Sequence, residues 1–261
     1  MVFGRIVMAV FALCLLLATP ALAHFGMVIP VDNLMERPGV MNLDFRFWHP
    51  MEGQGMNLVK PKAAGVFAKG KKISLLPALK EKKVDGYTTW QAQYRVKSPG
   101  DYIFYMTPQP YWEPSEDCFI IHYTKTIVDA LGAEEGWDGP VGLPMEIVPL
   151  TKPFGLYAGN NFSGLVLYKG KPLPGGEVEV EFYNVDGKLK APSGAYVTQL
   201  VKTDANGVFN WSIPWPGWWG FAALHTAEGY KIKHQGKDKD VELGGVIWIY
   251  AHPALSSEKG N

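Results

Sequence analysis

The stretch Asn42-Leu43-Asp44-Phe45-Arg46-Phe47-Trp48 alternates polar and apolar side chains and runs into His49 and Pro50. Successive side chains of a β-strand point to opposite faces, so this alternation predicts a strand with one buried face. Proline lacks a backbone N–H to donate, so Pro50 ends the pairing. If Phe45 and Phe47 face the core, His49 lies on the same face at the strand end.

Similar short segments recur along the chain, separated by turn signals such as Ser98-Pro99-Gly100-Asp101 and Thr203-Asp204-Ala205-Asn206-Gly207. Glycine, proline, asparagine and aspartate favour tight turns, so each cluster marks the end of one strand and the start of another. We expect strands over residues 42–48, 66–76, 88–96, 101–107, 119–123, 164–168, 177–183, 199–203, 208–213, 221–225 and 245–250, a turn or two of helix over 126–132, and an irregular loop over 132–144.

Short strands at this spacing, with little helix, predict an all-β fold of two immunoglobulin-like β-sandwich domains in tandem. We place the N-terminal β domain, with the candidate site, at residues 24–149. The C-terminal sandwich follows at residues 150–252, and residues 253–261 form a polar tail.

Residues 1–23 have the pattern of a secretory signal peptide. Arg5 gives a positive start, residues 6–18 are apolar, and Ala21-Leu22-Ala23 is a small-x-small cleavage site. Cleavage after Ala23 makes His24 the first residue of the mature chain. Cleavage after Ala21 would instead expose a Leu-Ala-His terminus, which binds nickel or copper in a square plane; the Ala21/Ala23 pair is the better site.

A terminal His24 offers a free α-amine beside its imidazole, and the two nitrogens can chelate one metal ion. An internal histidine offers the ring alone. Imidazole suits borderline divalent ions such as nickel, cobalt and copper. The alternative is that His24 is an ordinary exported N-terminus without a metal.

Composition excludes several other classes of function. Formal net charge is zero, with 25 basic and 25 acidic residues, so nothing favours nucleic acid or an anionic membrane surface as a partner. Beyond the signal, no apolar stretch approaches the about 20 residues that cross a bilayer. Nucleophile-elbow, phosphate-loop and His-Glu-x-x-His signatures are absent, and we expect no enzyme activity. Cys118 is the only cysteine outside the signal, so no internal disulfide is expected.

Two further histidines are candidate ligands in the first half. His49 ends its strand, and His122 lies in Cys118-Phe119-Ile120-Ile121-His122-Tyr123, just after the acidic pair Glu116 and Asp117. That pair could supply an oxygen ligand or accept a ring N–H. His24, His49 and His122 could therefore converge as a mostly nitrogen metal site; alternatively, His49 and His122 are hydrogen-bonded core histidines.

Several longer motifs resemble the exported DUF4198 family. They are His24-Phe25-Gly26-Met27, Trp48-His49-Pro50-Met51-Glu52-Gly53, Pro110-Tyr111-Trp112-Glu113-Pro114, Ile121-His122-Tyr123-Thr124-Lys125, the stretch from Leu150 to Asn160, and Gly217-Trp218-Trp219-Gly220-Phe221-Ala222-Ala223-Leu224. The resemblance covers nearly all of the mature chain.

The resemblance implies a periplasmic accessory component of energy-coupling-factor nickel/cobalt importers. Such a protein captures Ni²⁺ or Co²⁺ as cargo and passes the ion to membrane-embedded transporter subunits. Two alternatives remain: a Cu²⁺-binding histidine-brace protein, either a carrier or an oxidative polysaccharide enzyme, and a metal-free carbohydrate- or protein-binding β-sandwich.

Overall fold

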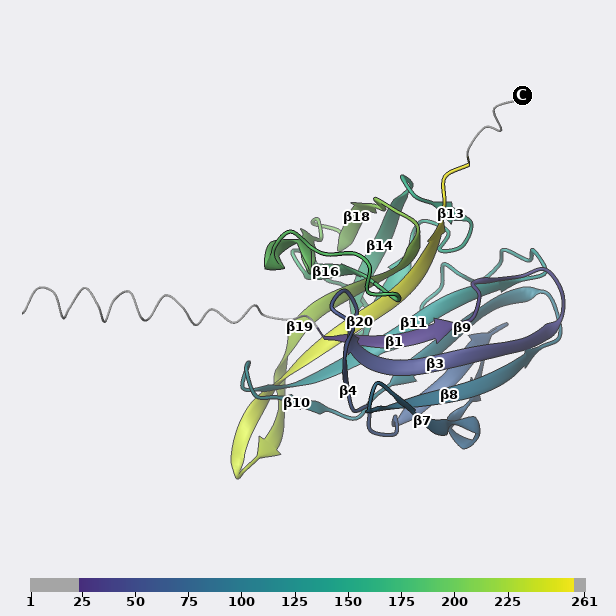
Figure 1. Cartoon of the computed structure of the whole chain (residues 1–261). Helices are drawn as coiled ribbons and strands as arrows, with labels where there is room; N and C mark the ends of the chain where they lie inside the picture. Colours follow the sequence, from purple (N-terminus) through teal and green to yellow (C-terminus); the bar gives the residue numbers. More distant parts are fainter. Residues whose placement is uncertain (1–23, 256–261) are drawn as a thin grey trace, which may run out of the picture.

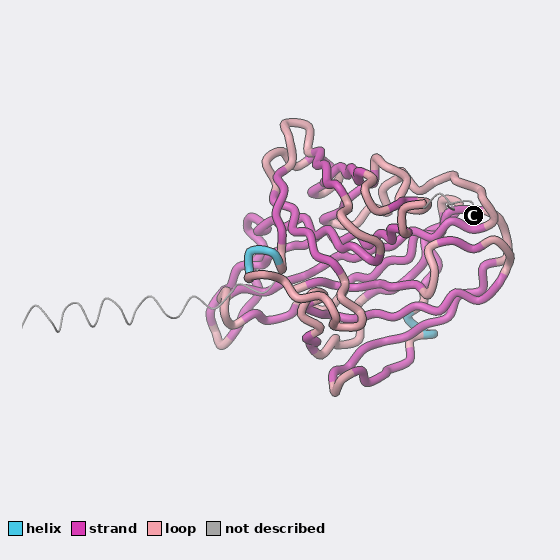
Figure 2. The backbone as a smooth tube through the Cα atoms, turned by 45° about the horizontal axis from the view of Figure 1, so that its top comes forward, coloured by secondary structure: helices cyan, strands magenta, loops and turns pink. Residues whose placement is uncertain are grey.

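The computed structural model describes residues 24–255, so the predicted signal peptide and the end of the tail lie outside the described residues. These residues are almost entirely β-structure, with only two short 3-10 turns, η1 (Leu76–Ala78) and η2 (Gly194–Tyr196) (Figure 2). The predicted all-β sandwich fold is confirmed. No helix within residues 24–255 has the length and apolar character that a bilayer span requires.

The strands form three sheets. The first contains β1 (Phe25–Pro30), β3 (Gly39–His49), β8 (Tyr87–Val96) and β7 (Lys80–Val84) in that order, with β4 (Gln54–Met56) paired to β3. The central sheet has the order β17 (Gln199–Lys202), β16 (Glu177–Phe182), β19 (Gly217–His234), β20 (Lys237–His252), β11 (Cys118–Ala130), β9 (Gly100–Thr107), β5 (Ala63–Ala68) and β6 (Lys71–Ser74), with β2 (Leu34–Met35), β10 (Tyr111–Glu113) and β13 (Leu156–Tyr157) attached. The third contains β12 (Met145–Pro149), β14 (Asn161–Tyr168), β15 (Lys171–Pro172) and β18 (Val208–Ser212).

The middle strands of the central sheet are buried on both faces. On β11, Ile120 and Val128 pack into the core shared with the first sheet, whereas Ile121 and Ile127 pack into the core shared with the third. Figure 1 shows β20 and β11 running between β14 and β18 on one side and β3 and β8 on the other. The fold is therefore three stacked layers, with hydrophobic core clusters on both sides of the middle sheet.

Strands from both halves of the chain pair within this sheet. Strand β11 runs parallel to β20, with Phe119 opposite Val241 and Thr126 opposite Trp248. Strand β12, which precedes residue 150, pairs with β14, which follows it. The division into domains 24–149 and 150–252 stays a prediction, but the two segments share hydrogen-bonded sheets.

Two expected elements differ from the structure. Residues 126–130 continue β11 instead of starting a helix, because β-branched Thr126, Ile127 and Val128 pair with flanking strands and fill buried positions. The single strand expected over 66–76 is a hairpin of β5 and β6. Lys69 and Gly70 both have positive φ, which forms a tight two-residue turn.

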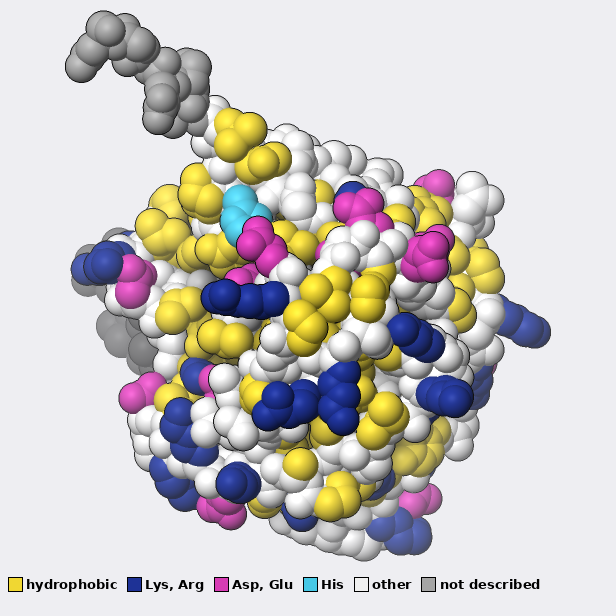
Figure 3. All heavy atoms as spheres, turned by 90° about the vertical axis from the view of Figure 1, so that its right-hand side faces the viewer, with side chains coloured by type: hydrophobic (Ala, Val, Ile, Leu, Met, Phe, Trp, Pro, Cys, Tyr) yellow, Lys and Arg dark blue, Asp and Glu magenta, His cyan; other side chains and the backbone are white. Residues whose placement is uncertain are grey.

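Surface charge is mixed. On the face in Figure 3, basic, acidic and apolar side chains lie near one another, in keeping with the balanced composition. Buried within the protein, by contrast, is an ion pair between Lys125 and Glu146. Lys125 Nζ lies 2.6 Å from Glu146 Oε1, and both side chains are 1% exposed. The Glu146 carboxylate also accepts the backbone N–H groups of Val141, Gly142 and Leu143.

We expect Lys125→Met to destabilise the fold by about 3 kcal/mol, because it leaves the Glu146 carboxylate buried without its cation. Adding Glu146→Gln should recover part of the loss. The measurement is urea unfolding of both variants. Lys188→Met removes the partner of Asp186 in an exposed pair and should leave the midpoint unchanged; an equal loss in both lysine variants would contradict the argument.

Candidate metal centre

Two of the three predicted histidines face each other at the edge of the first sheet. Antiparallel pairing places Phe25 of β1 opposite Trp48 of β3, so the adjoining residues His24 and His49 fall opposite each other. Their ring centroids are 4.5 Å apart, with the rings tilted by 52°. Both are largely withdrawn from solvent, with 10% of the His24 side chain and 5% of His49 exposed.

A carboxylate that the sequence pattern did not single out meets His24. Glu113, at the end of β10, places Oε2 2.9 Å from His24 Nε2. Its Oε1 accepts hydrogen bonds from the backbone N–H and the hydroxyl of Ser115. Burial alone would raise the pKa of Glu113, but the Ser115 hydrogen bonds and the nearby His24 and His49 outweigh it and lower that pKa. The side chain is therefore an ionised acceptor.

The acidic pair expected near His122 is engaged elsewhere. The Cys118 thiol donates to Glu116 Oε2 at 3.8 Å, and Asp117 forms an ion pair with Lys239 at 2.5 Å. Instead of that pair, Glu113 is the carboxylate that contacts a histidine of the site. It reaches His24 because β10 folds back on β11 with Glu113 opposite Cys118. In the sequence, the only sign of this position is that Glu113 precedes β11 by a few residues. Such a spacing does not fix the register of a hairpin.

His122 lies deeper, between the first sheet and the central sheet. Its Nδ1 accepts the backbone N–H of Gly26 at 3.4 Å, and its Nε2 is buried without a hydrogen-bond partner. The ring occupies space that a side chain at residue 244 would take, since a Cβ there would lie 2.3 Å from the ring Cδ2. Glycine at 26 likewise lets β1 approach the strand that carries His122.

Phe47 links the inner histidine to the outer pair. Its ring centroid is 5.5 Å from that of His24 and 5.9 Å from that of His122. The Tyr111 ring closes the same cluster, 5.0 Å from Phe47 and 5.6 Å from His24. A cavity of about 40 Å³ beside His122 is lined by Phe47 and Tyr111, which is enough space for a water molecule or an ion.

His24 and His122 are neutral at ordinary pH. Burial and the neighbouring His49 lower the pKa of His24 to about 4, against the opposing effect of Glu113. Burial and the nearby His24 lower the pKa of His122 to about 3. A neutral imidazole keeps one lone pair. In His24 the proton on Nε2 faces Glu113, so the lone pair is on Nδ1.

The remaining histidines lie outside this cluster. His225 packs against Tyr168 of the third sheet, and His252 lies at the far end of β20, paired with Tyr157. His234 ends β19 and stacks on Trp112 with centroids 3.9 Å apart. The Trp112 indole covers one face of the His234 ring.

The described residues 24–255 hold no preassembled group of three or more histidine, cysteine, aspartate or glutamate side chains in metal-binding arrangement. Cys118 supplies no thiolate, because burial and the acidic side chains of Glu242 and Glu116 raise its pKa to about 12. The site thus offers imidazole nitrogens and one ionised carboxylate.

The low pKa of His122 makes stability sensitive to acid. Unfolded histidine titrates near 6.5, and folded His122 near 3. Between these values the unfolded chain binds a proton that the folded protein excludes, so stability present above pH 6.5 is lost as the pH falls. Relative to His122→Gln, the unfolding free energy of the wild type should drop by about 2 kcal/mol between pH 7.5 and 5. Urea unfolding measures this, and parallel curves for the two proteins would refute it.

Three comparisons with known proteins bear on the fold and family of the chain. No curated protein matches the sequence. Among solved structures, the D0-D1 domain of intimin matches at 9% identity and TM-score 0.25, over 85% of this chain and 99% of that one. The Yersinia pseudotuberculosis adhesin InvE matches at 12% identity and TM-score 0.23, over 84% of this chain and 58% of that one. Scores this low carry no argument about function.

The family comparison is more informative. The model of the family described as "Domain of unknown function (DUF4198)" matches residues 21–227, which include His24, His49, Glu113 and His122. The match spans most of the chain, and the protein is therefore a member of the DUF4198 family.

Proposed function

We propose that this protein captures a divalent transition-metal ion, Ni²⁺ or Co²⁺, in the periplasm and delivers it to membrane-embedded subunits of a nickel/cobalt uptake transporter. The ion is cargo, and the proposal includes no catalysis. The observation that carries it is the pairing of the His24 and His49 rings at 4.5 Å beside the Glu113 carboxylate.

Glu113 fixes which nitrogen of His24 binds. Because Nε2–H donates to this carboxylate, Nδ1 keeps the lone pair. Nδ1 is also the ring nitrogen closer to the backbone, and with the α-amine it closes a small chelate ring on one ion. Removal of the signal peptide after Ala23 supplies that amine. His49, on the neighbouring strand, provides a further ring at the same edge.

His122 is the third proposed ligand. Its buried Nε2 lacks a partner, and buried polar atoms without partners are uncommon and call for an explanation. A mostly nitrogen site with open positions exchanges its ion readily, as a donor to a transporter must. The raised pKa of Cys118 agrees with a role without thiolate chemistry.

Copper is the second candidate ion, because the pair of His24 and His49 rings also suits Cu²⁺. A terminal histidine with a second histidine beside it forms a brace for Cu²⁺, and nitrogen donors bind Cu²⁺ more tightly than Ni²⁺ or Co²⁺. Selectivity for nickel or cobalt would have to come from geometry and supply.

The decisive experiment is calorimetric titration of the signal-processed protein with Ni²⁺, Co²⁺ and Cu²⁺. A variant with one alanine inserted before His24 keeps every side chain but moves the amine. We expect tight 1:1 binding of Ni²⁺ or Co²⁺ that the insertion and His49→Ala each weaken at least about a hundredfold, since each removes a ligand. Glu113→Gln should weaken it by about tenfold, because the tautomer of His24 is no longer held.

His225→Ala is the matched control, because that ring faces the third sheet, and it should bind like the wild type. Binding confined to Cu²⁺ would replace the nickel/cobalt proposal with the copper one. Absence of binding for all three ions, or binding unaffected by the insertion, would exclude the terminal chelate.

A further inference from the structure

A groove unrelated to the histidines lies between the outer face of the first sheet and the β16–β19 side of the molecule. It encloses about 800 Å³. One wall is the exposed face of β3 and β8, and the other contains Tyr183 and Trp218. None of the six histidines lines it.

The first wall is a ladder of planar polar side chains, here called the polar ladder: Asn42, Asp44, Arg46, Gln91 and Gln93. Antiparallel pairing sets Asn42 opposite Gln93 and Asp44 opposite Gln91. Across each pair a glutamine donates to its partner, at 2.8 and 2.6 Å. The alternating residues Leu43 and Phe45 fill the core, which turns the whole ladder outward.

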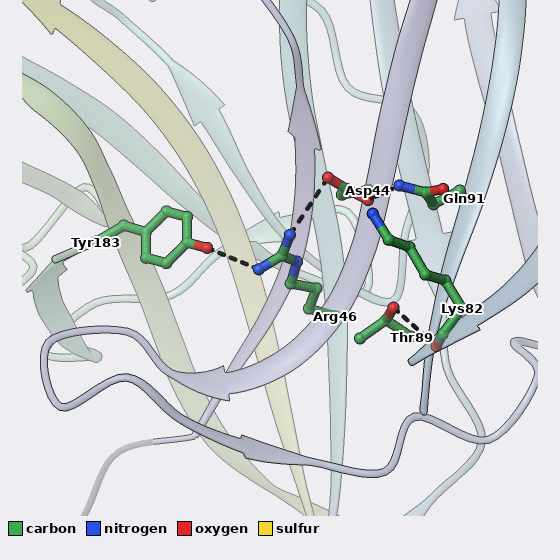
Figure 4. Close-up of polar contacts among 6 residues, drawn as sticks. All are labelled: Asp44, Arg46, Lys82, Thr89, Gln91 and Tyr183. Carbon is green, nitrogen blue, oxygen red and sulfur yellow. Dashed lines mark hydrogen bonds and ion pairs between the residues drawn. The ribbon is translucent and has the colours of Figure 1, made fainter. Parts of the chain in front are cut away.

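Arg46 ties the ladder to the opposite wall. It donates to Asp44 at 3.3 Å and to the Tyr183 hydroxyl at 2.9 Å (Figure 4). These contacts hold the planar groups in place before a ligand arrives. Its Nε is buried and has no hydrogen-bond partner.

The ladder keeps unused hydrogen-bonding capacity. Asn42 employs only its side-chain oxygen there, and Gln91 and Gln93 employ only their amide nitrogens. The other end of each amide remains available. A row of donors and acceptors at strand spacing matches a ligand with many hydroxyl groups.

Trp218 supplies an apolar platform across the groove. Its ring is half-buried and packs edge-on against Tyr250 with centroids 5.3 Å apart, so the indole is held in one orientation. Beyond Trp218 the groove continues into a cavity of about 1110 Å³ that shares Tyr183, Val185 and Trp218 with it and adds Trp211, Trp215 and Trp219.

We propose that this groove binds a neutral oligosaccharide. Sugar rings present apolar C–H faces that pack on indole and phenol rings, and their hydroxyls suit planar amide, carboxylate and guanidinium groups. The charge of Asp44 is balanced by Arg46, and Lys80 is the remaining charged residue of the lining. Because Asp44 and Arg46 pair with each other, the polar ladder itself carries no net charge, which suits an uncharged ligand.

The test is titration of the signal-processed protein with cellohexaose, chitohexaose and maltohexaose at millimolar concentrations, followed by tryptophan fluorescence and calorimetry. We expect at least one hexaose to bind. Trp218→Ala and Gln93→Ala should each weaken that binding by about tenfold or more, the loss of one stacking or hydrogen-bonding contact. Gln93 is solvent-exposed, so its variant keeps the fold even if Trp218→Ala does not, and unfolding midpoints check both.

Trp112→Ala and Gln54→Ala are matched controls outside the groove and should bind like the wild type. His49→Ala should bind the sugar normally, which separates this site from the proposed metal centre. The proposal is overturned if no hexaose binds, or if the control variants lose binding as much as the groove variants do. Binding of a protein partner at this groove in place of sugar would also overturn it.

Discussion

Burial of β11 on both faces is the constraint on which the rest of the molecule depends. The strand has core side chains above and below it, and it pairs with β20 along one edge and with β9 along the other. A strand placed this way has no solvent face, so its polar members must find partners within the protein. Lys125 meets Glu146 on one face, and His122 meets Gly26 on the other.

The proposed metal centre follows from the same arrangement. Strand β1 lies over β11 because glycine at 26 removes a Cβ that would strike Thr124. Pairing of β1 with β3 places His24 next to His49. The close approach of β1 to β11 brings His24 within reach of the β10 hairpin that carries Glu113. Burial lowers the pKa of His24 and of His122 and keeps these two rings neutral, which suits them for coordination and makes them costly to protonate. Glycine, rather than a ligand residue, is what allows the strands to come this close.

How much the sequence could predict depends on whether a strand has a solvent face. The alternation in residues 42–48 predicted β3 and the position of His49 beside Phe47, because one face of that strand is polar. Residues 126–130 gave no such alternation, since both faces are buried, and a helical turn was wrongly expected there. The parallel pairing of β11 with β20 had no local signal. Glu113 was missed for a related reason: its contact with His24 joins segments that are distant in sequence.

The pairing of Phe119 with Val241 joins the middle of the chain to a strand far along in sequence, and this has a kinetic consequence. Closing the long loop between these two residues costs chain entropy before the contact contributes any stabilisation. This contact therefore forms late and slowly. Until the last strand is synthesised and docked, β11 lacks a neighbour on one edge and His122 lacks the glycine surface beneath its ring. The N-terminal residues that would hold an ion are thus among the first made, but their site is completed only when the final strand arrives.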